Sequence, residues 1–470
     1  MQLMRRQIRR SLGLVTANLF MVTHGYAEPV VSQEPGVTPD SASPDQSGYG
    51  LASTTLDSSV MYYKEHGGRV KVLEPVARLT VTGNNGSIFT ATVIYDSLSG
   101  ASPNGATPWN ATQTFITPAP APSSTYSVTG ASGGRTIVTL PGTSTQVAEY
   151  TTAAHQLPVD PGFRDRRSAL ELGYSEKWSP VTSVSVGVAS SREHDYSSWS
   201  ANTSIIRDFN DHNTTARLGL SFEYDNSFPI FGTPTPLTLM NGNTKGPSQT
   251  KTVTSLITGL TQVMDRYWLL QANYEIGWNR GYQTDPYRIV SVVNPTTGGP
   301  MEYRYESRPR RRVRQSIYVA NKVAIGPTAA DISFRYYHDS WGVRSLTADL
   351  SERIPLSAKL YIQPELYYYK QTAANFFNYY LLGGQPLPQY VSADGRLAKF
   401  SARTLGIRIG YVLSPNTDLY VLAEDYKQMG QHHLPNAPGD LATENVFSGV
   451  HASSIVAGFT YKFNMSPDED

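Results

Sequence analysis

The segment 453–463, close to the end of the chain, constrains the fold more than any other stretch. Apolar residues alternate along it with small or polar residues almost without a break. Successive side chains of a β-strand point to opposite faces, so one face of such a strand is an apolar stripe that ends on an aromatic ring. The residues of this stripe are Ile455, Ala457, Phe459, Tyr461 and Phe463. The segment therefore predicts a terminal strand with an outward apolar face.

A terminal strand of this kind is similar to the one that closes bacterial outer-membrane barrels, and the start of the chain agrees. Arginines at 5, 6, 9 and 10 precede a short apolar run at 12–22, and small residues follow at 25 and 27. This is the pattern of a cleaved signal peptide. The apolar run is too short for a membrane-spanning helix, which needs about 20 residues. We predict a signal peptide over 1–27 and a place in the outer membrane of a Gram-negative bacterium.

Composition excludes several classes of protein. The chain has no cysteine, which removes disulfides, thiolate metal sites, iron–sulfur clusters and covalently attached haem. Charged residues make up 16% of the chain and the net charge is +1, so the electrostatic signature of a nucleic-acid-binding protein is missing.

From residue 56 onward, alternation bounded by turn residues predicts about sixteen strands, and hence an all-β, transmembrane antiparallel β-barrel over 56–463. An even number of strands places both termini in the periplasm. We expect 28–55 to be a disordered periplasmic lead-in, because it is Pro-rich and polar, and 464–470 to be a periplasmic tail. The strands are expected near 56–65, 71–82, 86–96, 167–178, 182–191, 195–207, 214–225, 249–262, 267–279, 310–323, 328–339, 343–354, 357–371, 398–412, 417–428 and 452–463.

The connections between these strands differ in length according to the side on which they fall. The turns expected on the inner side are all short, whereas the outer side has the long ones, as in outer-membrane barrels. The longest, 97–166, is Pro-, Ser-, Thr- and Gly-rich and contains a predicted hairpin at 136–140 and 146–151. It is interpreted either as a constriction of the pore or as an external flap. The long outer connections are 97–166, 226–248, 280–309, 372–397 and 429–451.

The strand at 267–279 shows how the two faces are sorted. One face carries Trp268, Leu270, Ala272, Tyr274, Ile276 and Trp278, an apolar band with aromatic residues at both ends. The other carries Gln271, Asn273, Glu275 and Asn279. Aromatic residues at the edges of an apolar band are typical of membrane barrels, so we expect lipid outside and a polar, wet lumen.

Arginines concentrate at 308–314, and alternation places Arg310, Arg312 and Arg314 on the inner face. Arginine stays charged and binds carboxylate or phosphate with a forked geometry, so this run is a candidate anion-attracting ladder. The alternative is a structural network with acids such as Glu275, Asp331 and Asp339, or contact with lipopolysaccharide phosphates. The pore-lining residues predicted to set selectivity are Arg310, Arg312, Arg314, Arg335, Glu275, Glu365 and Arg408.

Other chemistry has weak support. His338 and Ser340 share an outward face at a spacing that outer-membrane phospholipase uses, and His451 and Ser453 repeat it. A tight external turn explains His338 and Ser340 equally well. The pair His432-His433 lies in an expected external loop and is interpreted as a solvated pair, with a weak transition-metal site as the alternative. We therefore predict no catalytic residue, no metal and no cofactor, and expect that the protein is not an enzyme.

Four motifs resemble those of a Gram-negative outer-membrane family known only as a domain of unknown function. The most specific is Asp-Ser-Leu-Ser-Gly-Ala-Ser-Pro-Asn-Gly-Ala at 96–106, and the others lie at 335–342, 369–377 and, more loosely, 394–397. The chain departs from the family pattern at Lys370 and at 345–347. The resemblance covers most of 50–463 and implies no catalytic residues. Family members often accompany thioredoxin-like and flavin-transferase proteins, which implies a periplasmic redox partner.

The sequence thus favours a porin-like channel or transporter for small polar or anionic solutes. The alternative is a non-conducting scaffold barrel that serves an envelope redox or electron-transfer system, and a remote one is an outer-membrane lipid hydrolase. Expected partners are outer-membrane lipids, lipopolysaccharide and the outer-membrane assembly machinery, with no nucleic acid.

Overall fold

The computed structural model describes residues 51–118, 135–139, 146–230, 232–241 and 245–463. The predicted signal peptide at 1–27, residues 28–50 of the predicted lead-in at 28–55, and the predicted tail at 464–470 lie outside these residues. Among the described residues, no helix is long and apolar enough to cross a membrane.

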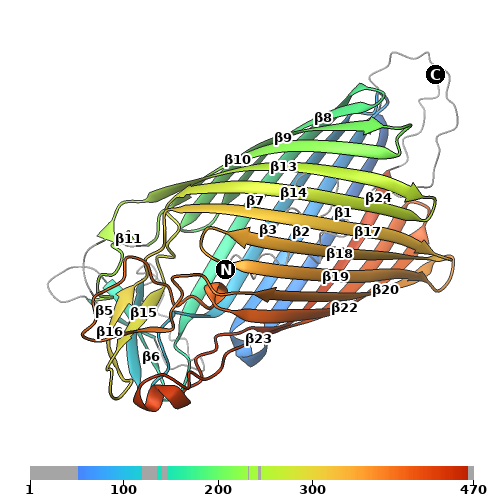
Figure 1. Ribbon diagram of the computed structural model, residues 1–470. Coiled ribbons are helices and arrows are strands. Elements are labelled where there is room, and N and C mark those ends of the chain that lie inside the picture. The colour runs from blue at the N-terminus through green and yellow to red at the C-terminus, as the bar shows by residue number, and fades with distance from the viewer. Residues whose placement is uncertain (1–50, 119–134, 140–145, 231, 242–244, 464–470) are drawn as a thin grey trace.

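Sixteen strands form one closed antiparallel barrel in which every strand pairs with its neighbours along the chain (Figure 1). Each corresponds to one of the sixteen predicted segments, so the fold prediction is confirmed. The strands are β1 (Leu51–Glu65), β2 (Val70–Gly83), β3 (Ile88–Pro103), β7 (Val159–Ser179), β8 (Thr182–Arg192), β9 (Tyr196–Phe209), β10 (Thr214–Ser227), β13 (Gln249–Asp265), β14 (Trp268–Gly281), β17 (Arg311–Ile325), β18 (Thr328–Asp339), β19 (Arg344–Pro355), β20 (Leu360–Gln371), β22 (Phe400–Ser414), β23 (Thr417–Gly430) and β24 (His451–Phe463).

Three strand boundaries differ from the prediction by five residues or more. β1 begins at Leu51, inside the predicted lead-in, and β7 begins at Val159, inside the predicted loop. β3 likewise continues to Pro103, which pairs with Val159. A strand crosses a membrane in about 9–11 residues, and β7 has 21. Beyond the lipid both faces of a strand can be polar, so the alternation that marks the rest of the strand is missing there.

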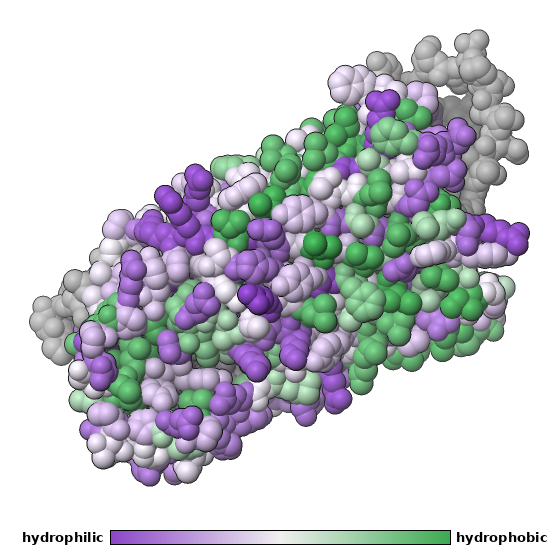
Figure 2. Space-filling model, viewed as in Figure 1, coloured by the Kyte–Doolittle hydropathy of each residue, from purple (hydrophilic) through white to green (hydrophobic). Residues whose placement is uncertain are grey.

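The facing predicted for β14 is confirmed, because Trp268 and Tyr274 are exposed on the outer surface while Gln271 and Asn273 are buried inside the barrel. On β10, Leu220 and Phe222 are exposed on the outer surface while Ser221 and Glu223 are buried inside the barrel. On the outer surface, hydrophobic residues gather over the part of the barrel nearer the short turns, whereas hydrophilic and hydrophobic residues are mixed at the end where the loops gather (Figure 2).

The terminal strand β24 closes the barrel by pairing with β23 on one side and β1 on the other, as predicted. Leu56 of β1 stands opposite Tyr461, and Tyr62 opposite Ile455. The stripe of Ile455, Tyr461 and Phe463 is exposed on the outer surface. The inner side of this seam differs from a wet lumen, because it holds a buried apolar cluster of Met61, Tyr63, Val70, Val72, Leu98, Tyr420, Leu422, Ala452 and Val456.

The long connections carry small sheets of their own, which gather at one end of the barrel (Figure 1). The connection after β3 forms β4 (Gln113–Pro118), β5 (Arg135–Thr139) and β6 (Gln146–Thr152), and the pairing of β5 with β6 confirms the predicted hairpin. In the next long loops, β11 (Thr233–Pro234) pairs with β12 (Lys245–Gly246), and β15 (Ile289–Val293) pairs with β16 (Pro300–Tyr305) and with β21 (Tyr380–Leu382). Three short 3₁₀ helices complete the described elements: η1 (His66–Gly68), η2 (Gly395–Leu397) and η3 (Gly439–Thr443).

If the outer face contacts lipid, the loss of stability caused by a charged side chain on that face should depend strongly on its depth in the membrane. Leu220→Arg, in the middle of β10, is expected to destabilise the barrel by about 2–4 kcal/mol, and Leu413→Arg, at the short-turn end of β22, by about 0–1 kcal/mol. Urea-induced unfolding of the reconstituted protein measures both. Equal costs for the two variants would contradict the assignment.

Candidate functional site in the lumen and its extracellular cap

Three of the predicted pore-lining arginines are buried on the inner wall, each on a different strand: Arg314 on β17, Arg335 on β18 and Arg408 on β22. The Nε atom of Arg408 lies 3.8 Å from a carboxylate oxygen of Glu365, and its guanidinium lies 4.7 Å from the ring centre of Tyr420. These side chains line one side of the lumen with fixed positive charge.

The remaining predicted residues divide into two groups. Glu275 on β14 and Glu365 on β20 are half-buried on the inner wall, Glu275 standing opposite Ser316. Arg310 precedes β17 and its side chain is exposed, and Arg312 forms an ion pair with the fully buried carboxylate of Asp339. The structural alternative therefore applies to Arg312.

Buried ion pairs also occur on strands where no pore-lining residue was predicted. Arg167 donates to Asp96 over 2.7 Å between β7 and β3, and Lys251 lies 2.7 Å from Asp225 between β13 and β10. Alternation alone could have placed these four side chains inside the barrel. The inner wall is thus charged over much more of its circumference than the run at 308–314 indicates.

The extracellular mouth is covered by loops that begin on different sides of the barrel and contact one another. The loop after β3 reaches the loop after β23, where His155 Nδ1 lies 2.8 Å from Glu444 Oε1 and Asn110 donates to Asp440 over 2.6 Å. It also reaches the loop after β14, because the amide of Ile289 donates to the carbonyl of Asn104. Around the closed barrel β3 and β23 are only four positions apart, whereas β3 and β14 are six positions apart, so the contact between the loops after β3 and β14 reaches over the mouth. We call the described parts of the joined loops 104–158, 228–248, 282–310, 372–399 and 431–450 the cap.

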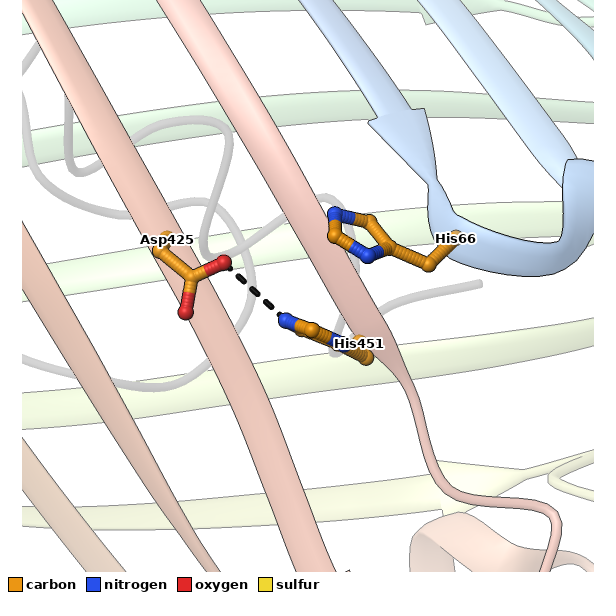
Figure 3. Close-up of side chains that lie close together, drawn as sticks. All are labelled: His66, Asp425 and His451. Atoms are coloured by element: carbon orange, nitrogen blue, oxygen red, sulfur yellow. Dashed lines mark hydrogen bonds and ion pairs between the residues drawn. The ribbon is translucent and has the colours of Figure 1, made fainter.

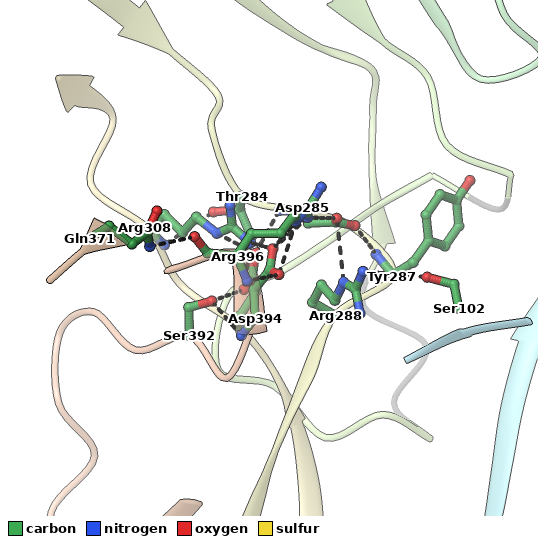
Figure 4. Close-up of polar contacts among 11 residues, drawn as sticks. Ser102, Thr284, Asp285, Tyr287, Arg288, Arg308, Gln371, Ser392, Asp394 and Arg396 are labelled. Atoms are coloured by element: carbon green, nitrogen blue, oxygen red, sulfur yellow. Dashed lines mark hydrogen bonds and ion pairs between the residues drawn. The ribbon is translucent and has the colours of Figure 1, made fainter. Parts of the chain in front are cut away.

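A largely buried network of charges joins two of the cap loops (Figure 4). Arg396 donates from Nε to both carboxylate oxygens of Asp394, at 2.9 and 2.7 Å, and from Nη2 to Asp285 over 2.7 Å. Asp394 also accepts from Arg308 over 2.8 Å. Asp285 and Arg308 belong to the loop after β14, whereas Asp394 and Arg396 belong to the loop after β20. The network therefore fastens one loop to the other.

Glu306 is bonded to this network through Arg308 and has no exposed surface. Its carboxylate accepts from Arg308, from Ser392 Oγ over 2.5 Å and from the amide of Asp285 over 2.7 Å. Burial raises the pKa of Glu306. Burial alone would also raise the pKa of Asp285, but Arg396, Arg288 and Arg308 together lower it to about 2. The same arginines hold the pKa of Asp394 well below its ordinary value.

The family-like motif at 96–106 guides the chain from the barrel wall into the cap. Gly100 has a φ of +144°, and a Cβ there would stand 1.7 Å from the carbonyl oxygen of Arg69. Gly105 has a φ of +99°, and a Cβ there would stand 2.3 Å from the carbonyl oxygen of Ile289. Between them Asn104 accepts from the amide of Ala106 and donates to the hydroxyl of Tyr150. Both glycines are required by close contact with neighbouring backbone.

The motifs at 335–342 and 369–377 meet at the rim. Asp339 Oδ1 accepts from the amides of Trp341 and Val343, which fixes the tight turn between β18 and β19. The Trp341 carbonyl accepts from the amide of Asn375, and Gly342, with a φ of +87°, leaves room for the Asn375 side chain. These motifs are structural supports of the cap.

Ser340 belongs to the same turn. Its hydroxyl accepts from the amide of Val313 over 3.0 Å, while its own amide donates to the Val313 carbonyl. His451 and Ser453, the second pair at this spacing, contact different partners: His451 Nε2 lies 3.0 Å from Asp425 Oδ1, and Ser453 Oγ lies 3.0 Å from His66 Nε2. In the loop after β23, His432 Nδ1 lies 3.2 Å from Asn445 Oδ1.

A closed barrel of sixteen antiparallel strands, apolar outside and charged inside, with short turns at one end and interlocked loops at the other, is an outer-membrane-type β-barrel protein. Over residues 35–463 the chain matches the family described as proteins of unknown function (DUF3570), and it belongs to that family. No curated protein matches the sequence.

Several solved structures from Pseudomonas aeruginosa are similar in fold. They include a mutant of the ferric enterobactin receptor PfeA (11% identity, TM-score 0.40, covering 88% of this chain and 60% of that one). OccK2 (OpdF) in complex with glucuronate has 10% identity and a TM-score of 0.36, covering 88% of this chain and 100% of its own. The outer membrane protein opdK has 9% identity and a TM-score of 0.36, covering 87% and 99%. The chain spans about three fifths of the receptor chain that it matches.

The charge network predicts that the cap opens when Arg396 is neutralised. Removing one partner of a buried ion pair costs about 3–5 kcal/mol because the remaining charge stays buried. Arg396→Gln is therefore expected to lower the free energy of cap opening by about 3 kcal/mol and to leave the barrel folded. Hydrogen exchange of the cap amides measures this opening. Arg310→Gln removes an exposed arginine nearby and serves as the matched control, and equal exchange in both variants would contradict the role of the network.

The same network predicts loss of cap stability in acid. The pKa of Asp285 is lowered from 3.8 to about 2, so its charged form stabilises the closed cap. This stabilisation is fully present above its ordinary pKa and is lost as the pH falls from about 4 toward 2. The fraction of open cap, measured by hydrogen exchange of the cap amides, should rise over that range in the wild type and change less in Asp285→Asn. A rise above pH 5 instead would identify a different titrating group.

Proposed function

We propose that the protein is a capped channel of the outer membrane that passes small polar solutes, anions among them. The observation that carries this proposal is the sorting of charged side chains onto the inner wall of a closed sixteen-strand barrel. A barrel of about sixteen to eighteen strands encloses an aqueous channel when no plug fills it. Charges on the inner wall are stable in such a barrel because water and paired charges solvate them.

Selectivity is assigned to Arg314, Arg335 and Arg408. These arginines are buried on the inner wall of strands β17 to β22, and arginine keeps its charge at any working pH. The carboxylates of Glu275 and Glu365 lie on the same wall and limit the preference for anions. Arg312 is assigned a structural role, because it is paired with Asp339.

The cap acts as the gate in this proposal. A solute that enters from outside has to pass the joined loops, so conductance requires them to separate or to be removed. The longest cap loop can be removed cleanly, because β3 and β7 stay paired up to Pro103 and Val159. A short Gly-Ser turn can therefore replace residues 105–157 without extending either strand.

Single-channel recording in planar bilayers tests the proposal. The full-length mature protein is expected to show rare or small openings, and the variant with 105–157 replaced is expected to conduct steadily. Hydrogen exchange of the barrel strands serves as the folding control for the shortened variant. If the folded variant also fails to conduct, the channel proposal is wrong and the non-conducting scaffold takes its place.

Anion preference supplies a separate test. In the conducting variant, Arg314→Ala together with Arg335→Ala is expected to lower the ratio of chloride to potassium permeability severalfold. Arg310→Ala, which removes an exposed arginine, is expected to leave the ratio unchanged. Reversal potentials in a salt gradient measure the ratio. An unchanged ratio in the double variant would overturn the assigned residues while leaving the channel itself intact.

A further inference from the structure

Two histidines and one carboxylate converge on the outer face of the seam where the barrel closes (Figure 3). His66 lies in the tight turn after β1, His451 is the first residue of β24, and Asp425 lies on β23. Among the described residues, this is the group of three metal-ligating side chains whose donor atoms all lie within 4.8 Å of one another. Strand alternation does not reveal this group, because its ligands come from opposite ends of the chain and meet only where β1 pairs with β24.

The geometry is compact. Asp425 Oδ1 lies 3.0 Å from His451 Nε2, and the rings of His66 and His451 have centres 3.8 Å apart and planes inclined by 33°. Zinc binds nitrogen and oxygen donors at about 2.0–2.2 Å, so two donors on one tetrahedral ion stand about 3.3 Å apart. The three donors already lie within 4.8 Å of one another, so they have to approach by at most about 1.5 Å to reach that spacing.

Strand pairing holds the backbone around the site in place. Asp425 and Lys64 both stand opposite Ser453 in the paired strands, and Lys427 stands opposite His451. Gly67 and Gly68, with φ of +78° and +74°, turn the chain sharply behind His66. The imidazole and carboxylate groups remain accessible, the side chains of His451 and Asp425 being 40% and 44% exposed. An ion can therefore reach the site from water.

We propose that His66, Asp425 and His451 bind a divalent transition-metal ion that clips the closing seam of the barrel. Two imidazoles and one carboxylate suit Zn²⁺, Cu²⁺ or Ni²⁺ better than Ca²⁺ or Mg²⁺, which prefer oxygen donors only. Three protein ligands leave one position for water or for the nearby Ser453 hydroxyl. The ion joins β23, β24 and the turn after β1, and so stabilises the pairing of the first and last strands.

Binding is tested with zinc chloride and the full-length mature protein in detergent, purified without a histidine tag. Isothermal titration calorimetry is expected to show one site, with affinity reduced about tenfold or more in His66→Gln, His451→Gln and Asp425→Asn. The matched control is His432→Gln with His433→Gln, which removes two other extracellular histidines and should leave the affinity unchanged. Copper(II) bound at the site should show coupling to two nitrogens in electron paramagnetic resonance.

Thermal unfolding tests whether the bound ion stabilises the closing seam. Zinc is expected to raise the temperature at which the folded barrel unfolds, and this rise should disappear in His451→Gln. Zinc binding that survives the combined loss of His66 and His451, or that depends on the loop histidines, overturns the site. Binding that requires the three ligands but leaves the unfolding temperature unchanged overturns the clip.

Discussion

The backbone hydrogen bonds of the barrel are the constraint on which the rest of the structure depends. A membrane interior offers no water, so every amide and carbonyl of a spanning segment has to pair within the protein. Sixteen strands satisfy this only because β24 pairs with β1 and leaves no edge. The facing rule follows from that closure, since each strand then has one side toward lipid and one toward the lumen. The apolar stripe of β24 and the buried apolar cluster on its inner side both stabilise the seam.

The cap obeys a different constraint. Its loops lie outside the lipid and are held by buried charges, by close backbone contacts at Gly100 and Gly105, and by small sheets. Its network of arginines and carboxylates is largely shielded from water, with Asp394 2% and Arg396 22% exposed, so each member depends on the others. Cap opening is therefore expected to be cooperative, and a gate with two well-defined states needs that property.

The sequence predicted the strands well and the site only in part. Period-two alternation revealed all sixteen strands, because lipid on one side and the lumen on the other enforce it, as on β10 with Phe222 and Glu223. Alternation could not reveal where β3 and β7 continue beyond the lipid, because both faces of a strand can be polar there. It also placed Arg312 among the selectivity residues, although its partner Asp339 comes from the next strand and was visible only as one alternative.

The cap network was harder to predict for a physical reason. Asp285, Glu306 and Arg396 lie in loops without periodicity, and their contacts join segments far apart in the chain. The only signal was the resemblance of the motifs at 96–106, 335–342, 369–377 and 394–397 to a family pattern, which carried no assigned role. In the structure these motifs share one role: they form the rim of the barrel and the contacts that hold the cap loops together.

The central claim is that the cap shields the lumen from the extracellular side. Because the native chain has no cysteine, a single cysteine introduced by Thr404→Cys on the inner wall of β22 reports access without background. The rate of its reaction with a membrane-impermeant maleimide, added outside intact cells, measures the shielding directly. A cysteine introduced by Thr296→Cys, on the exposed surface of the cap, gives the unshielded rate. We expect the inner cysteine to react far more slowly with the cap intact and nearly as fast when 105–157 is replaced. Equal rates at the two positions in the intact protein would contradict the claim.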